Sequence, residues 1–258
     1  MKHRSRNIII GIIPARYQSK RLPGKPLIKI GGISMIKRVY KQVEKSKHIS
    51  EIIVATDDKR ILNEVINFGG NAVMTSKKHK SGTDRIAEVV KNKKCDIVVN
   101  IQCDEPFIDP KIIDKAIKPL IDDNTLNVST LAVKFSNVED LYNEGNVKVV
   151  FDKDYNALYF SRAVIPFNRT DSGNNLKKVK TISKDKKFYK HIGLYVYRKR
   201  FLLKFARMKE SYLEKTEKLE QLRIIENGER IRVVLTNKDS LSIDTKNDLK
   251  KIKALLKH

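Results

Sequence analysis

The sequence predicts an α/β fold, in which helices cover both faces of a mostly parallel central sheet. Short apolar runs alternate with amphipathic segments through the first half of the chain. These runs are apolar throughout, which is typical of parallel strands buried on both faces. With 258 residues, 40% hydrophobic and 33% charged, the chain can form one large α/β domain or two small ones.

The first half is expected to contain five strands separated by helices. The predicted strands are 7–13, 51–55, 71–74, 96–101 and 127–133. Between them, apolar residues recur every three or four positions at 36–43, 61–66 and 112–117. Gly69 and Gly70 are a left-handed stop for the second helix, and Asp109 before Pro110 is a start for the third.

The second half has a different pattern. Segments 147–151 and 156–160 predict a β-hairpin across a short polar turn. Further strands are expected at 191–198, 231–236 and 240–244, and one helix at 217–228 that stops at Gly228. Thr245, with Asp248 three residues later, predicts the start of the last helix. Segment 168–190, rich in Lys, Asn, Ser and Thr, is a long connection of no assigned structure.

The chain is strongly basic, with a net charge of +24 from 54 basic and 30 acidic residues. Such a charge attracts anions, including nucleic acids. The lysines are spread along the whole chain, however, and no nucleic-acid-binding motif is present, so nucleic-acid binding remains a lower-ranked alternative. No run of about 20 apolar residues predicts a membrane span. Cys95 and Cys103 form neither a disulfide framework nor a zinc motif, which fits a reduced cytoplasm.

A cluster of positive charge follows the first predicted strand, with Arg16, Arg21 and Lys25 placed among prolines and Gly24. Loops at the carboxyl edge of a parallel sheet bind ligands, and Arg and Lys are suited to phosphate. The loop matches neither the dinucleotide-binding nor the Walker A pattern. A phosphate site and a solvated basic turn are both compatible with these residues.

Two aspartates could hold a magnesium ion beside that loop. Asp104 follows the fourth strand, which should neighbour the first strand at the switch point of a doubly wound sheet. Asp244 ends the last predicted strand. Mg²⁺ favours one or two carboxylates together with phosphate oxygens. Asp104 could instead cap a turn and Asp244 could cap the last helix, although Thr245 can serve there.

Other polar residues stand at the ends of predicted elements. Ser81, Gly82 and Thr83 begin a helix whose free N–H groups could hold a base or a phosphate, or form an ordinary N-cap. Candidates at strand ends or on the 217–228 helix are Arg162, His191, Tyr195, Glu220 and Gln221. A lone histidine on a strand is often a packing residue, and Glu220 and Gln221 could simply form a solvated helix face.

Read in order, nine segments resemble the 3-deoxy-manno-octulosonate (Kdo) cytidylyltransferases, or CMP-Kdo synthetases. They are IIPARYQSKRLPGKPL, VATDD, SGTDRIAEVV, NIQCDEPFI, VKVVFD, ALYFSRAVIP, HIGLYVYR, LEQLRIIENG and IDTKNDL. The resemblance covers roughly residues 9–249. CMP-sialate synthetases share the first motif but typically carry Gly-Gly where this chain has Tyr17 and Gln18. A related sugar acid, sialate or an amino-substituted Kdo, remains an alternative substrate.

The resemblance implies a glycosyltransferase-A-like, nucleotide-diphospho-sugar transferase fold in one domain, 1–258. Residues 1–135 would be the nucleotide-binding half, and 136–258 would bind the sugar acid, carry the dimerisation region and end in a helix. The family transfers CMP from CTP to Kdo for lipopolysaccharide synthesis in Gram-negative bacteria, usually as a cytoplasmic homodimer that uses Mg²⁺. The anomeric hydroxyl of Kdo would attack the α-phosphate in line while pyrophosphate leaves, with Mg²⁺ bridging the phosphate and the attacking hydroxyl.

The resemblance also implies roles for single residues. Arg16, Arg21 and Lys25 would hold the triphosphate, and Lys25, Asp104 and Asp244 would be catalytic, the two aspartates as magnesium ligands. The cytidine would lie near Ser81, Gly82 and Arg85. The sugar-acid pocket would include Gln102, Arg162, His191, Tyr195, Glu220 and Gln221, with Gln102 near the sugar or the α-phosphate.

One departure from the family pattern affects the site. Cys103 stands where the family usually has glycine between the glutamine and aspartate of QGDEP. Either the backbone there accepts a side chain, or the site is slightly reshaped.

Overall fold

The computed structural model describes residues 7–18, 22–168 and 187–255. Its strands are β1 (Ile9–Ala15), β2 (Lys29–Ile30), β3 (Ile33–Ser34), β4 (Glu51–Thr56), β5 (Ala72–Met74), β6 (Ile97–Asn100), β7 (Val128–Lys134), β8 (Lys148–Phe151), β9 (Ala157–Ser161), β10 (Tyr189–Arg198) and β11 (Ile231–Thr236). Nine of these strands form one sheet in the order β11-β7-β10-β6-β1-β4-β5, with β8 paired to β10 and β9 paired to β8.

The sheet is mostly parallel, as predicted. Along the main path every strand runs in the same direction except β10, which is antiparallel to both β6 and β7. The first and fourth predicted strands, β1 and β6, are neighbours, with Ile9 opposite Ile97. The predicted hairpin is also present, since β8 and β9 pair antiparallel across residues 152–156.

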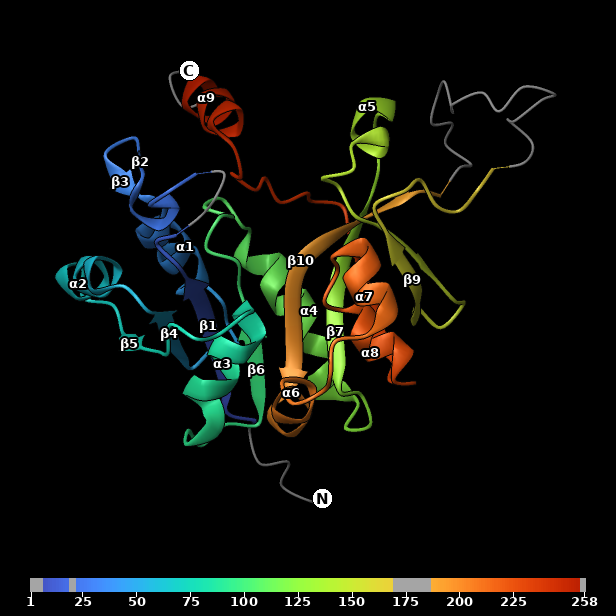
Figure 1. Cartoon of the computed structure of the whole chain (residues 1–258), viewed down its shortest axis with the longest axis horizontal. Coiled ribbons are helices and arrows are strands. Elements are labelled where there is room, and N and C mark those ends of the chain that lie inside the picture. The colour runs from blue at the N-terminus through green and yellow to red at the C-terminus, as the bar shows by residue number, and fades with distance from the viewer. Residues whose placement is uncertain (1–6, 19–21, 169–186, 256–258) are drawn as a thin grey trace.

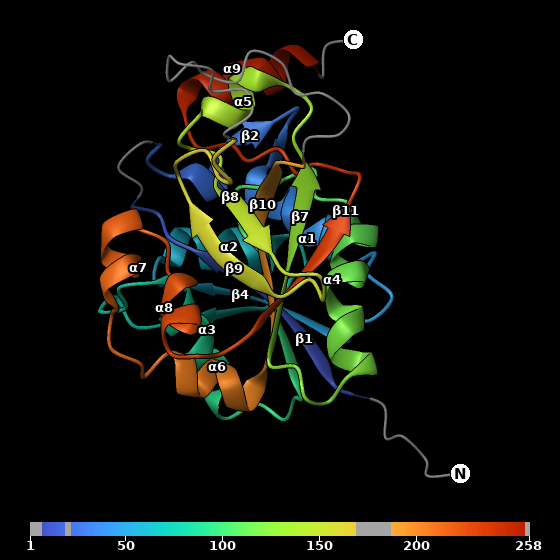
Figure 2. The ribbon, with the colours of Figure 1, turned by 90° about the vertical axis from the view of Figure 1, so that its right-hand side faces the viewer.

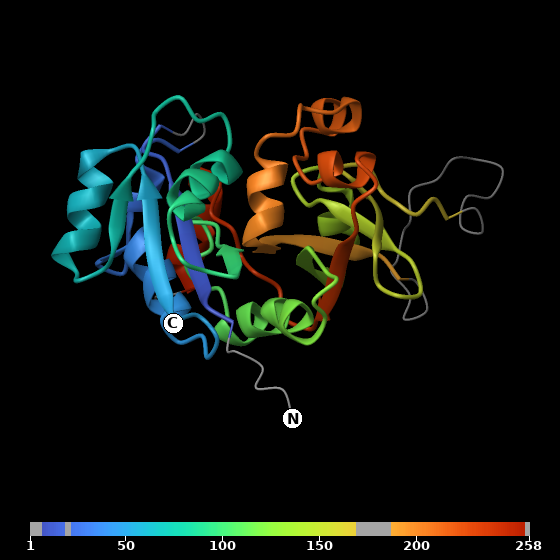
Figure 3. The ribbon, with the colours of Figure 1, turned by 90° about the horizontal axis from the view of Figure 1, so that it is seen from below.

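Helices cover both faces of the sheet. They are α1 (Met35–Val43), α2 (Lys59–Asn67), α3 (Gly82–Lys91), α4 (Pro110–Asp122), α5 (Val138–Tyr142), α6 (Lys199–Phe205), α7 (Tyr212–Glu217), α8 (Leu222–Glu226) and α9 (Lys246–Leu255), with a 3₁₀ turn at Lys25–Leu27. Seen from below, α4 in green and the orange α6 to α8 lie on opposite sides of the sheet (Figure 3). Among the described residues, no helix has the length and apolar character needed to cross a bilayer.

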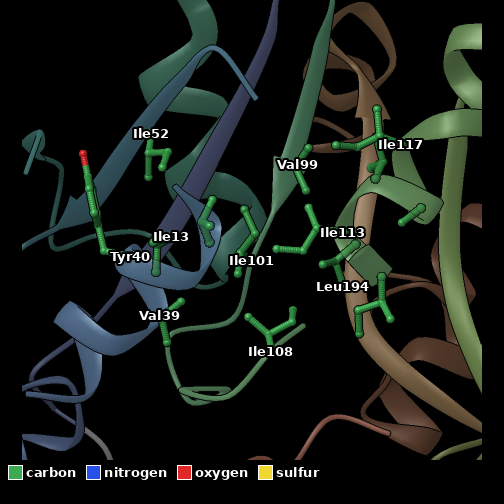
Figure 4. Close-up of a cluster of buried hydrophobic side chains, with 14 of the residues drawn as sticks. Ile13, Val39, Tyr40, Ile52, Val99, Ile101, Ile108, Ile113, Ile117 and Leu194 are labelled. Carbon is green, nitrogen blue, oxygen red and sulfur yellow. The ribbon is translucent and has the colours of Figure 1, made fainter. Parts of the chain in front are cut away.

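Alternating side chains of β1 supply both layers of the core. Ile9 and Ile13 pack with α1 and α4 in one cluster, and Ile10 and Ile12 pack with α3 and α6 in another. The first cluster extends from Ile13 on β1 to Leu194 on β10 (Figure 4). Because burying an isoleucine contributes roughly 1.5–3 kcal/mol, this run of isoleucines is a large part of what holds β1 at the centre of the sheet.

Two predicted elements were wrong. The helix expected at 217–228 is two short helices, because Lys218 adopts a left-handed conformation (φ 55°) that ends α7. A capping box of Ser211 and Glu214 starts α7 earlier than predicted. Segment 240–244 is not a strand, because it leaves the sheet after β11 to bury Ile243 against a separate apolar cluster.

The segment from β11 to α9 crosses between the two sides of the molecule, as the red chain in Figure 1 shows. The backbone N–H of Ile243 donates to the carbonyl of Asp104 (2.9 Å). Thr245 and Asp248 then form the predicted capping box that begins α9. α5 and α9 lie at the same end of the sheet, opposite the N-terminus (Figures 1 and 2). The crossing therefore brings residue 244 to the carboxyl edge of β1 and β6.

Candidate active site

A cleft of about 290 Å³ lies at this carboxyl edge. Several distant segments line it: the loop after β6, strand β10, the turn between α7 and α8, and the segment after β11. Six of the residues predicted from the sequence are among its lining: Gln102, Asp104, His191, Tyr195, Gln221 and Asp244. The fold thus brings together residues that are up to 142 positions apart, counted from 102 to 244.

Lys25 lies at the rim of this cleft, between two carboxylates. Its Nζ is 2.6 Å from Asp104 Oδ2 and 3.0 Å from Asp244 Oδ1. Gly24 adopts a left-handed conformation (φ 67°) and Pro26 follows, which starts the 3₁₀ turn that carries Lys25. Burial disfavours the charged ammonium, but the charge and hydrogen bond of Asp104, together with smaller effects that include the charge of Asp244, outweigh it and raise the pKa of Lys25 to about 12.

Asp104 and Asp244 fit a magnesium ion as a donor set. Both carboxylates already converge on one cation, the Lys25 ammonium, and both remain partly exposed, at 20% and 32%. Mg²⁺ needs only one or two carboxylates when phosphate and water supply its other ligands. Within the described ranges there is no cluster of three or more His, Cys, Asp or Glu that could hold a metal alone. A metal here would therefore depend on substrate oxygens.

Arg16 ties the basic loop to the start of α3. Its guanidinium donates to the carbonyls of His79 (2.6 Å) and Ser81 (3.1 Å). Ser81 in turn caps α3 through a reciprocal pair of hydrogen bonds with Asp84. Burial, followed by repulsion from Arg85, lowers the pKa of Arg16. The predicted triphosphate and cytidine residues are therefore adjacent, although Ser81 itself is committed to an N-cap.

Arg85 does not line the cleft. It is fully buried, and its guanidinium pairs with Asp57 (2.7 Å) and contacts the hydroxyl of Thr75. Its placement stabilises the loop after β4 rather than presenting a charge to a ligand. Asp57 is a partner that reasoning from the sequence missed, although the VATDD motif contains it. Arg21 lies outside the described residues.

His191 and Tyr195 project from β10 into an aromatic cluster. The His191 ring meets Phe160 edge-on at 5.0 Å and lies 5.3 Å from the Tyr195 ring. Burial lowers the pKa of His191 to about 3, so its imidazole is neutral at physiological pH. Gln102 Nε2 lies 3.3 Å from both Asn100 Oδ1 and the Gly193 carbonyl. These two contacts hold the Gln102 amide between β6 and β10.

The break between α7 and α8 sends two adjacent side chains to different places. Gln221 is buried and lines the cleft described above. Glu220 instead accepts a hydrogen bond from Thr83 (2.6 Å) and lines a neighbouring cleft that also includes Ser81. Burial raises the pKa of Glu220. Glu220 and Gln221 were predicted to share one pocket, but they line two neighbouring clefts.

Arg162 also lies apart from the cleft lining. Its guanidinium donates to the carbonyls of Glu217 (2.9 Å) and Glu144 (3.0 Å), beside the end of α7. Gly82 sits at the first turn of α3, where an added Cβ would lie 3.5 Å from Pro14. The roles implied for these residues toward a ligand stay predictions.

The Cys103 backbone accepts a side chain. Among the described residues the non-glycine positions with positive φ are Tyr155 and Lys218, so Cys103 is not in the conformation that favours glycine. Its side chain packs against the apolar cluster that β1 forms with α1 and α4, and burial raises the pKa of its thiol to about 12. Glu105, missed by the sequence reasoning, is buried beside it and accepts a hydrogen bond from Ser240 (2.8 Å).

The chain is similar to known cytidylyltransferases in both sequence and fold. The family model described as Cytidylyltransferase matches residues 10–231. The 3-deoxy-manno-octulosonate cytidylyltransferase of Geotalea daltonii is 50% identical over 249 residues, covering 96% of this chain and 98% of that protein. A solved CMP:2-keto-3-deoxy-manno-octonic acid synthetase, in complex with CTP, superposes with a TM-score of 0.88 at 38% identity, covering 97% and 98% of the two chains.

A more distant solved structure shares the fold alone. The 4-diphosphocytidyl-2C-methyl-D-erythritol synthase of Anaerococcus prevotii superposes with a TM-score of 0.63 at 16% identity, covering 98% of this chain and 100% of that one.

Proposed function

The chain belongs to the 3-deoxy-manno-octulosonate cytidylyltransferase family, and we propose that it transfers CMP from CTP to the anomeric hydroxyl of Kdo. The products are CMP-Kdo, an activated sugar for lipopolysaccharide synthesis, and pyrophosphate. One observation carries the proposal: six predicted residues line a single cleft, and two of them are the aspartates that pair with Lys25 at its rim. The CTP complex of the similar synthetase supports CTP as the nucleotide.

The reaction needs positioning and charge neutralisation more than acid–base chemistry. The hydroxyl oxygen of the sugar forms a bond to the α-phosphorus, the bond from that phosphorus to the β-phosphate bridge breaks, and the hydroxyl proton passes to solvent. Lys25 would neutralise charge on the triphosphate and on the leaving pyrophosphate. Arg16 would hold the basic loop against the start of α3, where the cytidine is proposed to bind.

Asp104 and Asp244 would hold Mg²⁺ when CTP is bound. In that state the ion would polarise the α-phosphate and lower the pKa of the attacking hydroxyl. A dedicated histidine base is then unnecessary, which agrees with the low pKa of His191. His191, Tyr195 and Gln221 would bind the sugar acid.

The proposal also includes the oligomeric state, the division of the chain into two halves and the cellular location. The chain would act as a homodimer, so sedimentation should give twice its mass of 29.7 kDa. The half up to residue 135 would bind the nucleotide, and the rest would bind the sugar acid. The cytoplasmic location expected from its two cysteines is consistent with both of them being free thiols.

The deciding experiment measures pyrophosphate release from each of the four nucleoside triphosphates, with and without Mg²⁺, against a panel of 2-keto sugar acids. CTP with Kdo should be used fastest, and removal of Mg²⁺ should abolish the reaction. Preference for sialate or an amino-substituted Kdo would replace the proposed substrate. Salt-sensitive DNA binding with no pyrophosphate release would instead favour the reading based on the +24 charge.

A further inference from the structure

Thr130 is a buried hydroxyl residue in the middle of β7, opposite an irregularity in β10. In the pairing of these strands, Leu131 faces Ile192 but Thr130 faces Tyr195, so β10 has two extra residues at this point. Such a bulge disrupts the ladder and can leave backbone groups in need of other partners. The Thr130 hydroxyl lies 2.8 Å from the carbonyl of Leu194 and 3.3 Å from that of Ile192.

The same hydroxyl also contacts the imidazole of His191. Thr130 Oγ1 and His191 Nε2 are 2.9 Å apart, and Thr130 is fully buried. A hydroxyl has one proton to donate and two lone pairs to accept with. The short contact with the Leu194 carbonyl requires that proton, because two oxygens at 2.8 Å repel one another without it. The Thr130 oxygen can then only accept from His191, so Nε2 must carry the imidazole proton.

The other ring nitrogen, Nδ1, is left as an acceptor toward the cleft. The imidazole is neutral, so only one of its nitrogens carries a proton. Nothing in the described parts of the chain hydrogen-bonds Nδ1, it is not among the buried polar atoms without a partner, and His191 lines the cleft. The aromatic rings of Phe160 and Tyr195 hold the imidazole plane from its sides.

We propose that Thr130 is a positioning residue that holds His191 in the Nε2–H tautomer, so that His191 Nδ1 accepts a hydrogen bond from a hydroxyl or amino group of the substrate. His191 Nδ1 would then accept a hydrogen bond from a donor group on the sugar ring. It could not bind the sugar carboxylate, which has no proton to donate at neutral pH. The identity of the occupant rests on the proposed function, whereas the tautomer is a property of the protein alone.

The tautomer is tested directly by two-bond ¹H–¹⁵N NMR of the full chain, with the His191 signals assigned from the His191→Gln variant. Between pH 6 and 8, Nε2 should appear as a protonated, pyrrole-type nitrogen and Nδ1 as a pyridine-type nitrogen. The reverse pattern would overturn the proposal. This measurement needs no substrate, so it stays informative even if the proposed activity fails, and it needs no Thr130 variant that might not fold.

Kinetics test whether the tautomer matters for the sugar acid. Thr130→Val keeps the shape of the side chain but removes the hydroxyl, so the KM for Kdo should rise roughly three- to tenfold, the usual effect of one hydrogen bond, with the KM for CTP unchanged. Thr130→Ser should restore most of the loss. Ser129→Ala is the matched control, because Ser129 is equally buried but donates to Ala116 (2.6 Å) on the other side of the strand.

Substrate analogues identify what Nδ1 contacts. Fluorine can replace a hydroxyl in size but cannot donate a hydrogen bond, so one monofluoro derivative of Kdo should bind the wild type several-fold more weakly. The same substitution should cost much less in Thr130→Val, because the two changes remove one interaction. Equal losses in both proteins at every ring position would contradict the proposal, as would a rise in the KM for CTP equal to that for Kdo.

Discussion

The ammonium of Lys25 lies 2.6 Å from the carboxylate of Asp104, across a gap of 79 residues in the sequence. Asp244 approaches the same ammonium from a third segment, at 3.0 Å. One cation and two carboxylates therefore meet where three distant loops converge, at the edge of the cleft. The arrangement holds both carboxylates close together around one positive charge.

Replacing either carboxylate should impair catalysis. Asp104→Asn and Asp244→Asn are each expected to lower kcat by about 10²–10³-fold or more, because each removes charge that would hold the metal and the reacting phosphate. Steady-state pyrophosphate release measures the effect, and circular dichroism confirms the fold. Asp122→Asn is the matched control, since Asp122 pairs with Lys118 on an exposed helix surface. Turnover near that of the wild type in either variant would refute the metal assignment.

Replacing Lys25 should separate the two substrates. Lys25→Ala removes the charge proposed to face the triphosphate, so the KM for CTP should rise by at least tenfold while the KM for Kdo changes little. Initial rates measured against each substrate at saturation of the other give both values. Lys29→Ala, an exposed lysine on β2, serves as the control. An unchanged dependence on CTP would reject the phosphate role of Lys25.

The base of the basic loop should be sensitive to a single methyl group. Gly24 has φ 67°, donates its N–H to the carbonyl of Tyr17 (2.9 Å), and would place a Cβ 3.2 Å from the Tyr17 ring. The Arg60 guanidinium stacks on that ring, 3.3 Å from its centroid. Gly24→Ala should therefore cost the roughly 1–2 kcal/mol of a left-handed alanine, plus the cost of moving the ring, in urea unfolding.

Gly69→Ala measures the conformational cost alone, so the difference between the two variants gives the cost of moving the Tyr17 ring. Gly69 is also left-handed, at φ 81°, but nothing lies within 4 Å of an added Cβ. Gly69→Ala should lose only the free energy of placing alanine in a left-handed conformation, and its KM for CTP should equal that of the wild type. If both glycine variants behave alike, the contact between Tyr17 and Gly24 does not shape the loop.

The buried His191 should make the protein sensitive to acid. Its pKa is about 3 in the folded state and near 6.5 when unfolded, so the unfolded chain takes up the proton first as the pH falls. Keeping His191 neutral therefore contributes fully to the free energy of unfolding above about pH 6.5. That contribution is lost as the pH falls toward 3, at no more than about 1.4 kcal/mol per pH unit. The unfolding free energy of His191→Gln should therefore decline less between pH 7 and pH 4. The exposed His48, changed to Gln, should leave the slope as in the wild type.

Glycine should be tolerated at position 103. The Cys103 backbone does not need a positive φ, so Cys103→Gly should keep wild-type or better turnover. Its stability should fall by about 0.5–1 kcal/mol through the extra freedom of glycine, and further through the lost packing of the thiol against the apolar cluster. Pyrophosphate release and urea unfolding measure the two effects. A severe loss of turnover would show that the Cys103 side chain takes part in the reaction.

Much of the fold follows from local pattern. The apolar runs of β1, β4 and β6 and the helical periodicity of α1, α2 and α4 mark these elements because each has a face that must be buried. Errors occurred where no local residue signals the outcome. Lys218 ends a helix in a conformation that glycine usually adopts, and 240–244 reads as a strand although no sheet edge receives it.

The candidate site, like the fold, was only partly predictable from local sequence. The sequence alone determined the order of the motifs and hence the family, and it predicted which residue types would carry the chemistry, because charged and glycine residues at strand ends can be recognised one segment at a time. Only the tertiary structure decided which of these residues share a cleft. It placed Gln221 in the cleft and Glu220 beside it, and buried Arg85 against Asp57. It also set the proton on His191 through Thr130, since hydrogen bonds between strands depend on a register and a bulge that form only when the sheet assembles.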